Sequence, residues 1–451
     1  MFVAILWITA CNKDDCQDND QLTVDKSSKT TDDSIRHNND MSLLFKCYGD
    51  TKISEDEVFE IANSAHSLFG SSLSKNGKRI ADFKKMNYRT ILSKSAKTAD
   101  SIPVYFINYE KTGFVIVAGD RRLPQILAYA PEGTYEDDGQ SGYTIFMKRL
   151  PAFVQYVVDS IQSEYEMKKD SLYDILANNG SASDSIGNDV SLGKGYLRPT
   201  YTPARDPNER YLEMQRILYK SYTSPKYEHF LPTKWHQGSP FNNRAPICSG
   251  IEHMPAGCVV TAVGQIVAYH RYPSKLGGYS FNWSKILEDS CGQSDTAGVA
   301  RLCYELGKLV KIQYGCDGSS SNIYNAYDAF RRMGYTADNV KDYDEQSIIN
   351  SLGNGCPVYI KGSYGDDGHA WVIDGVYVVN HETHRMVSVM GAYGPKKTYP
   401  EICIDRWPYI HCNYGHSSQK PIYVYSSTFT ETLNGDFYYW NKCKMITNIK
   451  R

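Results

Sequence analysis

The chain has 451 residues, which is long for one ordinary domain, so we expect two. Hydrophobic residues make up 41% and charged residues 22% of the sequence, which is typical of a globular protein. The 49 basic and 51 acidic residues leave a net charge of -2, and no long basic run occurs, so a nucleic-acid partner is not expected.

Twelve cysteines are spread along the chain without a C-x-x-C pair, so neither a zinc site nor a thioredoxin-like site is expected. One or two disulfides would fit the sequence, which leaves their pairing open. No P-loop, dinucleotide-binding glycine set, G-x-S-x-G motif or EF-hand loop occurs. We therefore expect no metal and no organic cofactor.

The N-terminus has features of an export signal. Residues 2–10 form an apolar run of the length of a signal h-region, too short to span a bilayer as a helix. Residues 8–11 resemble a bacterial lipoprotein box, in which Cys11 would be lipidated; a plain secretory signal is the alternative. We expect 1–11 to be a signal peptide with a lipobox. The protein would then be secreted, or a cell-surface or outer-membrane lipoprotein of a bacterium, touching the membrane only through the lipid.

The first half of the chain then predicts a small domain between two linkers. Residues 12–50 are polar and predict a disordered linker. Residues 51–169 predict a small α+β domain. Its expected elements are a helix over 56–69, strands over 104–108, 113–119 and 126–130, and a closing helix through 153–165. Residues 170–205 form a second linker by composition.

Residues 206–451 carry all the candidate chemistry. Cys258 follows Gly257 and opens an apolar run with helical spacing that ends before Pro273. A thiol in the first turn of a helix lies in the positive field of the N-terminus, which favours the nucleophilic thiolate. Residues 357–360 and 370–373 predict buried strands whose connecting turn presents His369.

Cys258 is the candidate nucleophile and is expected to be unpaired, although a buried structural thiol is the commoner fate of a cysteine. His369 is the candidate base, which would take the thiol proton and return it to the leaving amine. His270 lies too far along the same predicted helix to reach Cys258. His411 and His416 are candidates only for the wall of a site.

Several separated blocks resemble the streptopain family of papain-like cysteine peptidases. In the second half they are Trp235-x-Gln237-x-x-Pro240-x-Asn242, Gly257-Cys258, Tyr314-Gly315, Gly368-His369-Ala370 and Asn413-x-Gly415. In the first half, 107–108, 113–121 and 124–133 resemble the family's propeptide domain. The resemblance implies an α+β protein with two domains. A smaller α+β prodomain comes first in the chain, and a papain-like domain follows, with a helix-borne cysteine against an antiparallel sheet.

The resemblance also implies roles and partners. Asn413 would orient the imidazole, and Gln237 would donate to the oxyanion together with the Cys258 amide. Trp235, Gly257, Gly368 and Tyr414 would line the substrate cleft. The partners would be protein or peptide substrates, with an apolar side chain preferred two residues before the cut, and the propeptide in cis. The 170–205 linker would carry the maturation site.

One segment departs from the family's motif. The family usually carries Trp-Gly-Trp after the asparagine, whereas this chain has Tyr414, Gly415 and His416, followed by a rebuilt loop. This departure supports one alternative to a secreted cysteine endopeptidase made as a zymogen, a surface protein that binds peptides without turnover. A cell-wall amidase or acyltransferase using the same thiol is a second alternative, against which the resemblance to the propeptide domain argues. Asp374 is expected to be a strand-end residue that fixes its turn.

Overall fold

The computed structural model of the protein describes residues 27–69, 79–89, 101–135, 144–179, 211–227, 230–248, 250, 252–364, 367–390, 397–416, 421–429 and 443–451. The expected signal peptide with Cys11 lies outside these residues, as does the linker from residue 180 to 205. No helix in the described part of the chain is both long and apolar enough to cross a membrane.

The chain divides into two compact units. The main unit contains residues 50–162, 222–379 and 407–451, and the smaller unit contains 1–49, 163–221 and 380–406. The sequence predicted a boundary at the 170–205 linker, with the prodomain on one side and the peptidase domain on the other. In the structure the cores of both belong to the main unit, because they share one sheet and one hydrophobic cluster.

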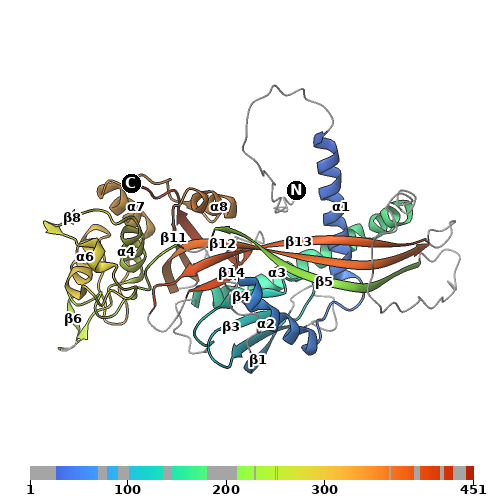
Figure 1. Cartoon of the computed structure of the whole chain (residues 1–451), viewed down its shortest axis with the longest axis horizontal. Helices are drawn as coiled ribbons and strands as arrows, with labels where there is room; N and C mark the ends of the chain where they lie inside the picture. The colour runs from blue at the N-terminus through green and yellow to red at the C-terminus, as the bar shows by residue number, and fades with distance from the viewer. Residues whose placement is uncertain are drawn as a thin grey trace. The chain divides into compact units, whose positions relative to one another are not determined.

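The N-terminal part of the main unit is an antiparallel sheet on which one helix packs (Figure 1). Its elements are α2 (Glu55–Phe69), β1 (Ile80–Arg89), β2 (Ser101–Tyr109), β3 (Phe114–Ala118) and β4 (Ile126–Ala130). All residues of β3 and β4 are buried, as a continuous apolar run predicts, and α2 packs on both strands. The predicted helix and the three predicted strands are confirmed. The closing helix, α3 (Thr144–Asn179), is longer than expected and extends into the predicted linker.

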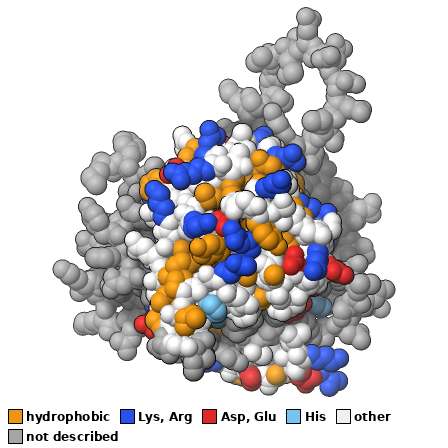
Figure 2. Space-filling view, turned by 90° about the vertical axis from the view of Figure 1, so that its left-hand side faces the viewer, with side chains coloured by type: hydrophobic (Ala, Val, Ile, Leu, Met, Phe, Trp, Pro, Cys, Tyr) orange, Lys and Arg blue, Asp and Glu red, His pale blue; other side chains and the backbone are white. Residues whose placement is uncertain are grey.

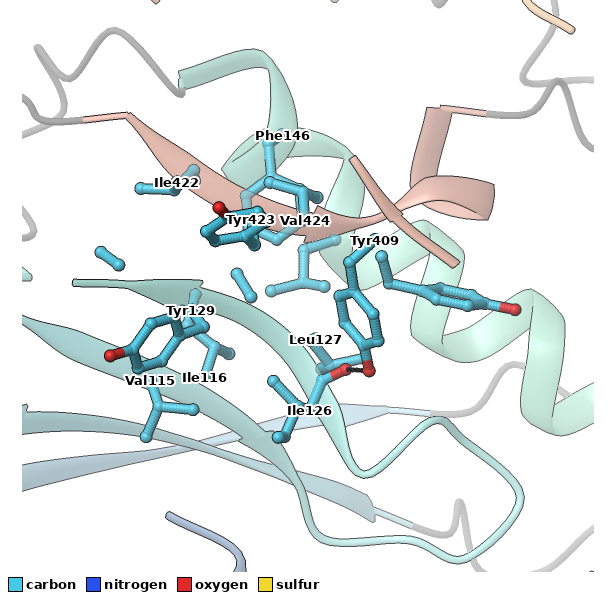
Figure 3. Packing of buried hydrophobic residues seen from close by; sticks show 14 of the residues in the cluster. Val115, Ile116, Ile126, Leu127, Tyr129, Phe146, Tyr409, Ile422, Tyr423 and Val424 are labelled. Carbon is cyan, nitrogen blue, oxygen red and sulfur yellow. Dashed lines mark hydrogen bonds between the residues drawn. The ribbon is translucent and has the colours of Figure 1, made fainter. Parts of the chain in front are cut away.

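The sheet continues from this part directly into the peptidase region. β4 pairs with β14 (Ile422–Tyr425) in antiparallel register, and Tyr409 Oη donates to the Ile126 carbonyl at 2.5 Å. Figure 3 shows the side chains of β3 and β4 packed with Tyr409, Phe146 and those of β14 in one buried cluster. The two regions are therefore joined by backbone hydrogen bonds and by a common core.

The peptidase region is a helical layer packed on the rest of that sheet. Its main elements are α4 (Cys258–His270), α5 (Trp283–Ile286), α6 (Thr296–Leu309), α7 (Ile323–Arg332), α8 (Glu345–Gly353), β10 (Lys341–Asp342), β11 (Val358–Tyr364), β12 (Asp367–Met390), β13 (Lys397–Asn413), the 3₁₀ helix η1 (Ser426–Phe429) and β15 (Cys443–Ile446). α4 is buried on nearly its whole surface, between α6, α7 and β11. A cysteine-bearing helix on an antiparallel sheet confirms the expected α+β class.

Two short hairpins, β6 (Ile247–Cys248) with β7 (Glu252–His253) and β8 (Lys275–Leu276) with β9 (Tyr279–Ser280), lie outside the main sheet. A disulfide joins Cys248 in β6 to Cys316 in the loop before α7. Figure 2 faces the end of the main unit that carries α6 and α7, where basic side chains are interspersed with apolar ones.

The smaller unit contains α1 (Ser27–Cys47), the end of α3, most of β5 (Tyr211–Tyr227) and the distal parts of β12 and β13. Met41 and Leu44 are fully buried, and Lys46 pairs with Asp405 of β13 at 2.7 Å. Residues 27–47 therefore form a packed helix within the range that the sequence predicted to be a disordered linker. Their few apolar side chains lie close together near the helix end, where they are buried together.

Candidate active site

Cys258 is the first residue of α4, and its side chain is buried, with 8% exposed. Gly257 is the N-cap and has a φ of 92°, a backbone conformation that strains any residue with a side chain. A Cβ on Gly257 would also lie 2.9 Å from both Ile312 Cδ1 and the Ser319 carbonyl oxygen. The glycine therefore allows the chain to turn sharply into the helix, and the thiol lies at the positive end of the helix dipole.

His369 comes from the start of β12, and its side chain interacts with the Cys258 thiol. Its Nε2 lies 2.8 Å from the Tyr414 carbonyl, which can only accept, so Nε2 carries a proton and Nδ1 remains for the thiol. The ring stacks on Trp371 with 6.2 Å between centroids and 15° between planes. The imidazole is therefore held on one edge and one face. The structure brings together the two residues that the sequence predicted to react.

The electrostatics of this pair favour the charged state. Burial raises the pKa of the Cys258 thiol, but His369, the Lys361 ammonium and the Ala370 amide outweigh burial and lower that pKa from 9.0 to about 7. Burial lowers the pKa of His369. Its interactions with Cys258, a hydrogen bond and a charge interaction, raise that pKa above its ordinary value. The two shifts agree, and together they favour thiolate beside imidazolium near neutral pH.

Asn413 lies at the end of β13, but its amide is engaged elsewhere. Nδ2 donates to the Thr233 carbonyl at 2.9 Å and to Gln265 Oε1 at 3.0 Å. Oδ1 accepts from Gln265 Nε2 and from the Gly415 backbone, each at 3.2 Å. The sequence predicted that this side chain orients the imidazole. Instead, the backbone carbonyl of Tyr414, one residue further, bonds to the ring.

Gln265 is the buried residue that the sequence analysis missed. It lies on α4 two turns after Cys258 and is completely inaccessible. Its Oε1 also accepts from Thr233 Oγ1 at 3.0 Å and from the Trp235 backbone at 3.3 Å. One amide thus links the cysteine-bearing helix to the segment before Gln237 and, through Asn413, to the turn that holds His369. The only sequence signal was a polar residue within an apolar helical run.

Gln237 lies beside the nucleophile by way of its backbone. Its carbonyl accepts from the Ala256 amide at 2.8 Å, two residues before Cys258. Its side chain is half-buried. The segment that carries Gln237 is therefore joined by its backbone to the residues that lead into α4.

The four predicted cleft residues have different environments. Gly368 is exposed, and Gly257 is buried at the helix cap. Trp235 is 1% exposed and packs against Gly264 of α4, where an added Cβ would lie 3.3 Å from its ring. Tyr414 is 2% exposed and packs on Trp371. These two aromatic side chains lie within the core, so they support the site from behind and have little surface for a substrate.

Asp374 and His411 form a second buried pair. Asp374 Oδ1 accepts from His411 Nδ1 at 2.5 Å, and Oδ2 accepts from the Leu231 amide at 3.0 Å. The sequence predicted that Asp374 fixes the turn at the end of its strand and that His411 lines the wall of the site, but both side chains are almost fully buried. His270 bonds to the Ile449 carbonyl, at the other end of α4 from Cys258. In the described part of the chain, no three His, Cys, Asp or Glu side chains converge as a metal site would require.

Comparisons with known proteins find similar proteins for both regions of the chain. Residues 235–423 match the model of the Peptidase C10 family, and residues 51–151 match the model of the Spi protease inhibitor. Streptopain from Streptococcus pyogenes is 25% identical over 318 residues, which cover 60% of this chain and 68% of that protein. A thiol protease/hemagglutinin, PrtT, from Porphyromonas gingivalis is 22% identical over 315 residues, which cover 62% of this chain and 32% of that one.

Among solved structures, a prointerpain A fragment from Prevotella intermedia is similar, with 15% identity, a TM-score of 0.48, and coverage of 81% of this chain and 99% of that one. The family models match the two regions in the order that the sequence predicted. The chain is therefore similar to streptopain-like cysteine peptidases over residues 235–423, with a propeptide-like region, residues 51–151, ahead of them.

Proposed function

We propose that the protein is a secreted cysteine endopeptidase made as a zymogen. The observation that carries this proposal is the Cys258–His369 pair at the N-terminus of α4, with the thiol pKa lowered to about 7. A thiol with that pKa is substantially ionised at neutral pH, when an ordinary cysteine is largely protonated. The pair therefore has the nucleophile, and the acid, that peptide hydrolysis needs.

In the proposed reaction the Cys258 thiolate attacks the peptide carbonyl carbon, and the carbonyl π-electrons move to oxygen. The Cys258 amide and the Gln237 side chain stabilise that oxyanion. When the C–N bond breaks, the His369 imidazolium gives its proton to the leaving amine. Neutral His369 then takes a proton from water, whose oxygen attacks the thioester carbon. The acid is released and the thiolate–imidazolium pair is restored.

Asn413 and Gln265 act in this scheme without touching substrate. Their paired amides fix the 413–415 turn, whose carbonyl at Tyr414 holds Nε2 of His369. The fixed imidazole then presents Nδ1 to the thiol. We therefore propose Asn413 as a positioning residue, one step further from the ring than the sequence suggested.

The region from about 50 to 170 is proposed as an inhibitory propeptide, and cleavage in the 170–205 linker would release activity. The match of residues 51–151 to a protease-inhibitor model supports this, as does the pairing of β4 with β14. The N-terminal sequence supports export and a lipid on Cys11, which would hold the propeptide at the bacterial surface.

The test is a time course of intact mass under mild reducing conditions, with casein present, for the wild type and Cys258→Ala. We expect the wild type to shorten from 51.0 kDa and to degrade casein, while the variant stays whole. If both stay whole, trypsin is added to cut the linker and the casein assay is repeated. Intact casein after that cut would contradict peptidase activity, and digestion of peptidoglycan instead would indicate an amidase.

A further inference from the structure

Lys361 is a cation beside the candidate site that the proposed mechanism does not use. It belongs to β11 and is half-buried. Its ammonium donates to the Ser321 carbonyl at 2.8 Å. Within the described residues no carboxylate forms an ion pair with it. A half-buried ammonium has three protons to donate, and a carbonyl satisfies one of them.

The position of Lys361 is fixed by strand pairing. In the β11–β12 register it stands opposite Ala370, the residue after His369. Opposite residues on antiparallel strands project to the same face, so the lysine and Ala370 share a face of the sheet. A Cβ built on Gly368 would lie 3.9 Å from Lys361 Nζ. The ammonium is therefore next to exposed backbone at the start of β12, immediately before the catalytic histidine.

The charge of Lys361 acts on the reacting pair. It lowers the pKa of both Cys258 and His369. Both effects have the sign of a nearby positive charge, which stabilises thiolate and disfavours imidazolium. The ammonium therefore lies close enough to influence the site electrostatically while its own hydrogen bond goes to Ser321.

A bound peptide would pass this group. To react, a carbonyl carbon must lie at Cys258 Sγ. The preceding residue, Gly257, lies against Ser319, and exposed Gly368, the residue before His369, lies next to Lys361 Nζ. The loop that carries Ser319 is fastened to β6 by the Cys248–Cys316 disulfide and to β11 by Lys361 itself. A substrate side chain directed between Gly368 and the loop would meet the ammonium.

We propose that Lys361 determines specificity by accepting the carboxylate of a substrate Asp or Glu that flanks the cut bond. The inference rests on the proposed peptidase function and gives it a substrate class, peptides with an acidic residue near the cleavage site. It departs from the apolar preference that the family resemblance implies. Hydrogen bonds to a charged partner discriminate by about 10- to 100-fold, so the preference should be measurable.

The first measurement uses the linker-cleaved protein and a positional peptide library, followed by a matched pair of peptides with Glu or Gln at the selected position. The wild type should favour the Glu peptide by about 10- to 100-fold in kcat/KM. Lys361→Met should lose this preference and Lys361→Glu should favour a basic residue instead. Lys285→Met, which removes an exposed cation elsewhere in the peptidase region, is the matched control and should behave like the wild type.

Two further arms keep the outcome interpretable. Binding of the same two peptides to linker-cleaved Cys258→Ala, by fluorescence anisotropy, tests the subsite even if no turnover occurs. Lys361→Gln, which can still donate to Ser321, separates loss of charge from loss of the loop contact. Casein cleavage without any acidic preference would overturn the Lys361 inference alone. Failure to cleave any substrate, with Glu peptide still bound more tightly, would overturn the peptidase proposal and leave the subsite supported.

Discussion

His369 in β12 and His411 in β13 lie on neighbouring strands and each pairs with another side chain, but only one of the two pairs is arranged to react. His369 faces a thiol at a helix N-terminus and stands beside exposed Gly368. His411 faces Asp374, whose second oxygen already accepts from a backbone amide. Both rings are fixed, so rigidity does not separate them. The difference is that the first pair contains a nucleophile next to accessible backbone, while the second pair is buried in the core and its carboxylate is bound to the backbone.

The largest expected effect is on the free energy of unfolding, and it should distinguish the Asp374–His411 pair from the Cys258–His369 pair. Asp374→Ala leaves buried His411 without its carboxylate, so the free energy of unfolding should fall by about 3–5 kcal/mol. The folded fraction should keep its kcat, because neither residue touches substrate. Chemical denaturation and active-site titration of the same sample measure the two quantities. A large fall in kcat per folded molecule, with unchanged stability, would mean that the inner pair takes part in the reaction.

The next effect concerns the oxyanion. Gln237→Ala should lower kcat by roughly 10²–10³-fold with little change in KM, because the amide would bind charge that develops only in the transition state. Gln346→Ala, which removes an exposed glutamine side chain from α8, serves as the control. An unchanged kcat would assign the second donor to another group.

The reactive pair can also be resolved by pH. Alkylation of Cys258 by iodoacetamide requires thiolate, so its rate should rise with pH through a midpoint near the thiol pKa of about 7. His369→Ala removes the largest of the interactions that lower this pKa and leaves burial, which raises it, opposed only by Lys361 and the Ala370 amide. The midpoint should therefore move to higher pH, and alkylation at pH 6 should slow by about 100-fold. Equal midpoints in both proteins would show that the histidine does not lower the thiol pKa.

The smallest effect should come from Gln265. Gln265→Leu removes the amide that aligns α4 with the 413–415 turn, and a slight misplacement of His369 should reduce kcat by roughly 10-fold or more. Gln265→Glu keeps the acceptor for Thr233, Trp235 and Asn413 and should recover part of the rate. The alkylation midpoint, which global stability does not set, should shift in the Leu variant toward that of His369→Ala. A loss of stability without that shift in the alkylation midpoint would mean that Gln265 stabilises the core but does not position His369.

The contrast also explains what the sequence could and could not predict. Gly257, Cys258 and the apolar face of α4 are local signals, because a cap, a nucleophile and a helix period occupy adjacent residues. The partner of Asn413 depends on Gln265, 148 positions away, and on Thr233, 180 positions away. Such pairings follow from strand register and helix placement. For the same reason the sequence did not predict the Cys248–Cys316 disulfide, the Asp374–His411 pair or the packing of α1.

The pairing of β4 with β14 has a consequence for the matured protein. While the propeptide is in place, β14 has a neighbour on each side, β13 and β4. If the propeptide departs after cleavage, one side of β14 becomes an open sheet edge with unpaired amides and carbonyls next to Tyr423 and Val424. Such an edge readily recruits another extended chain. Release of the propeptide would therefore give the matured enzyme a new backbone-pairing surface.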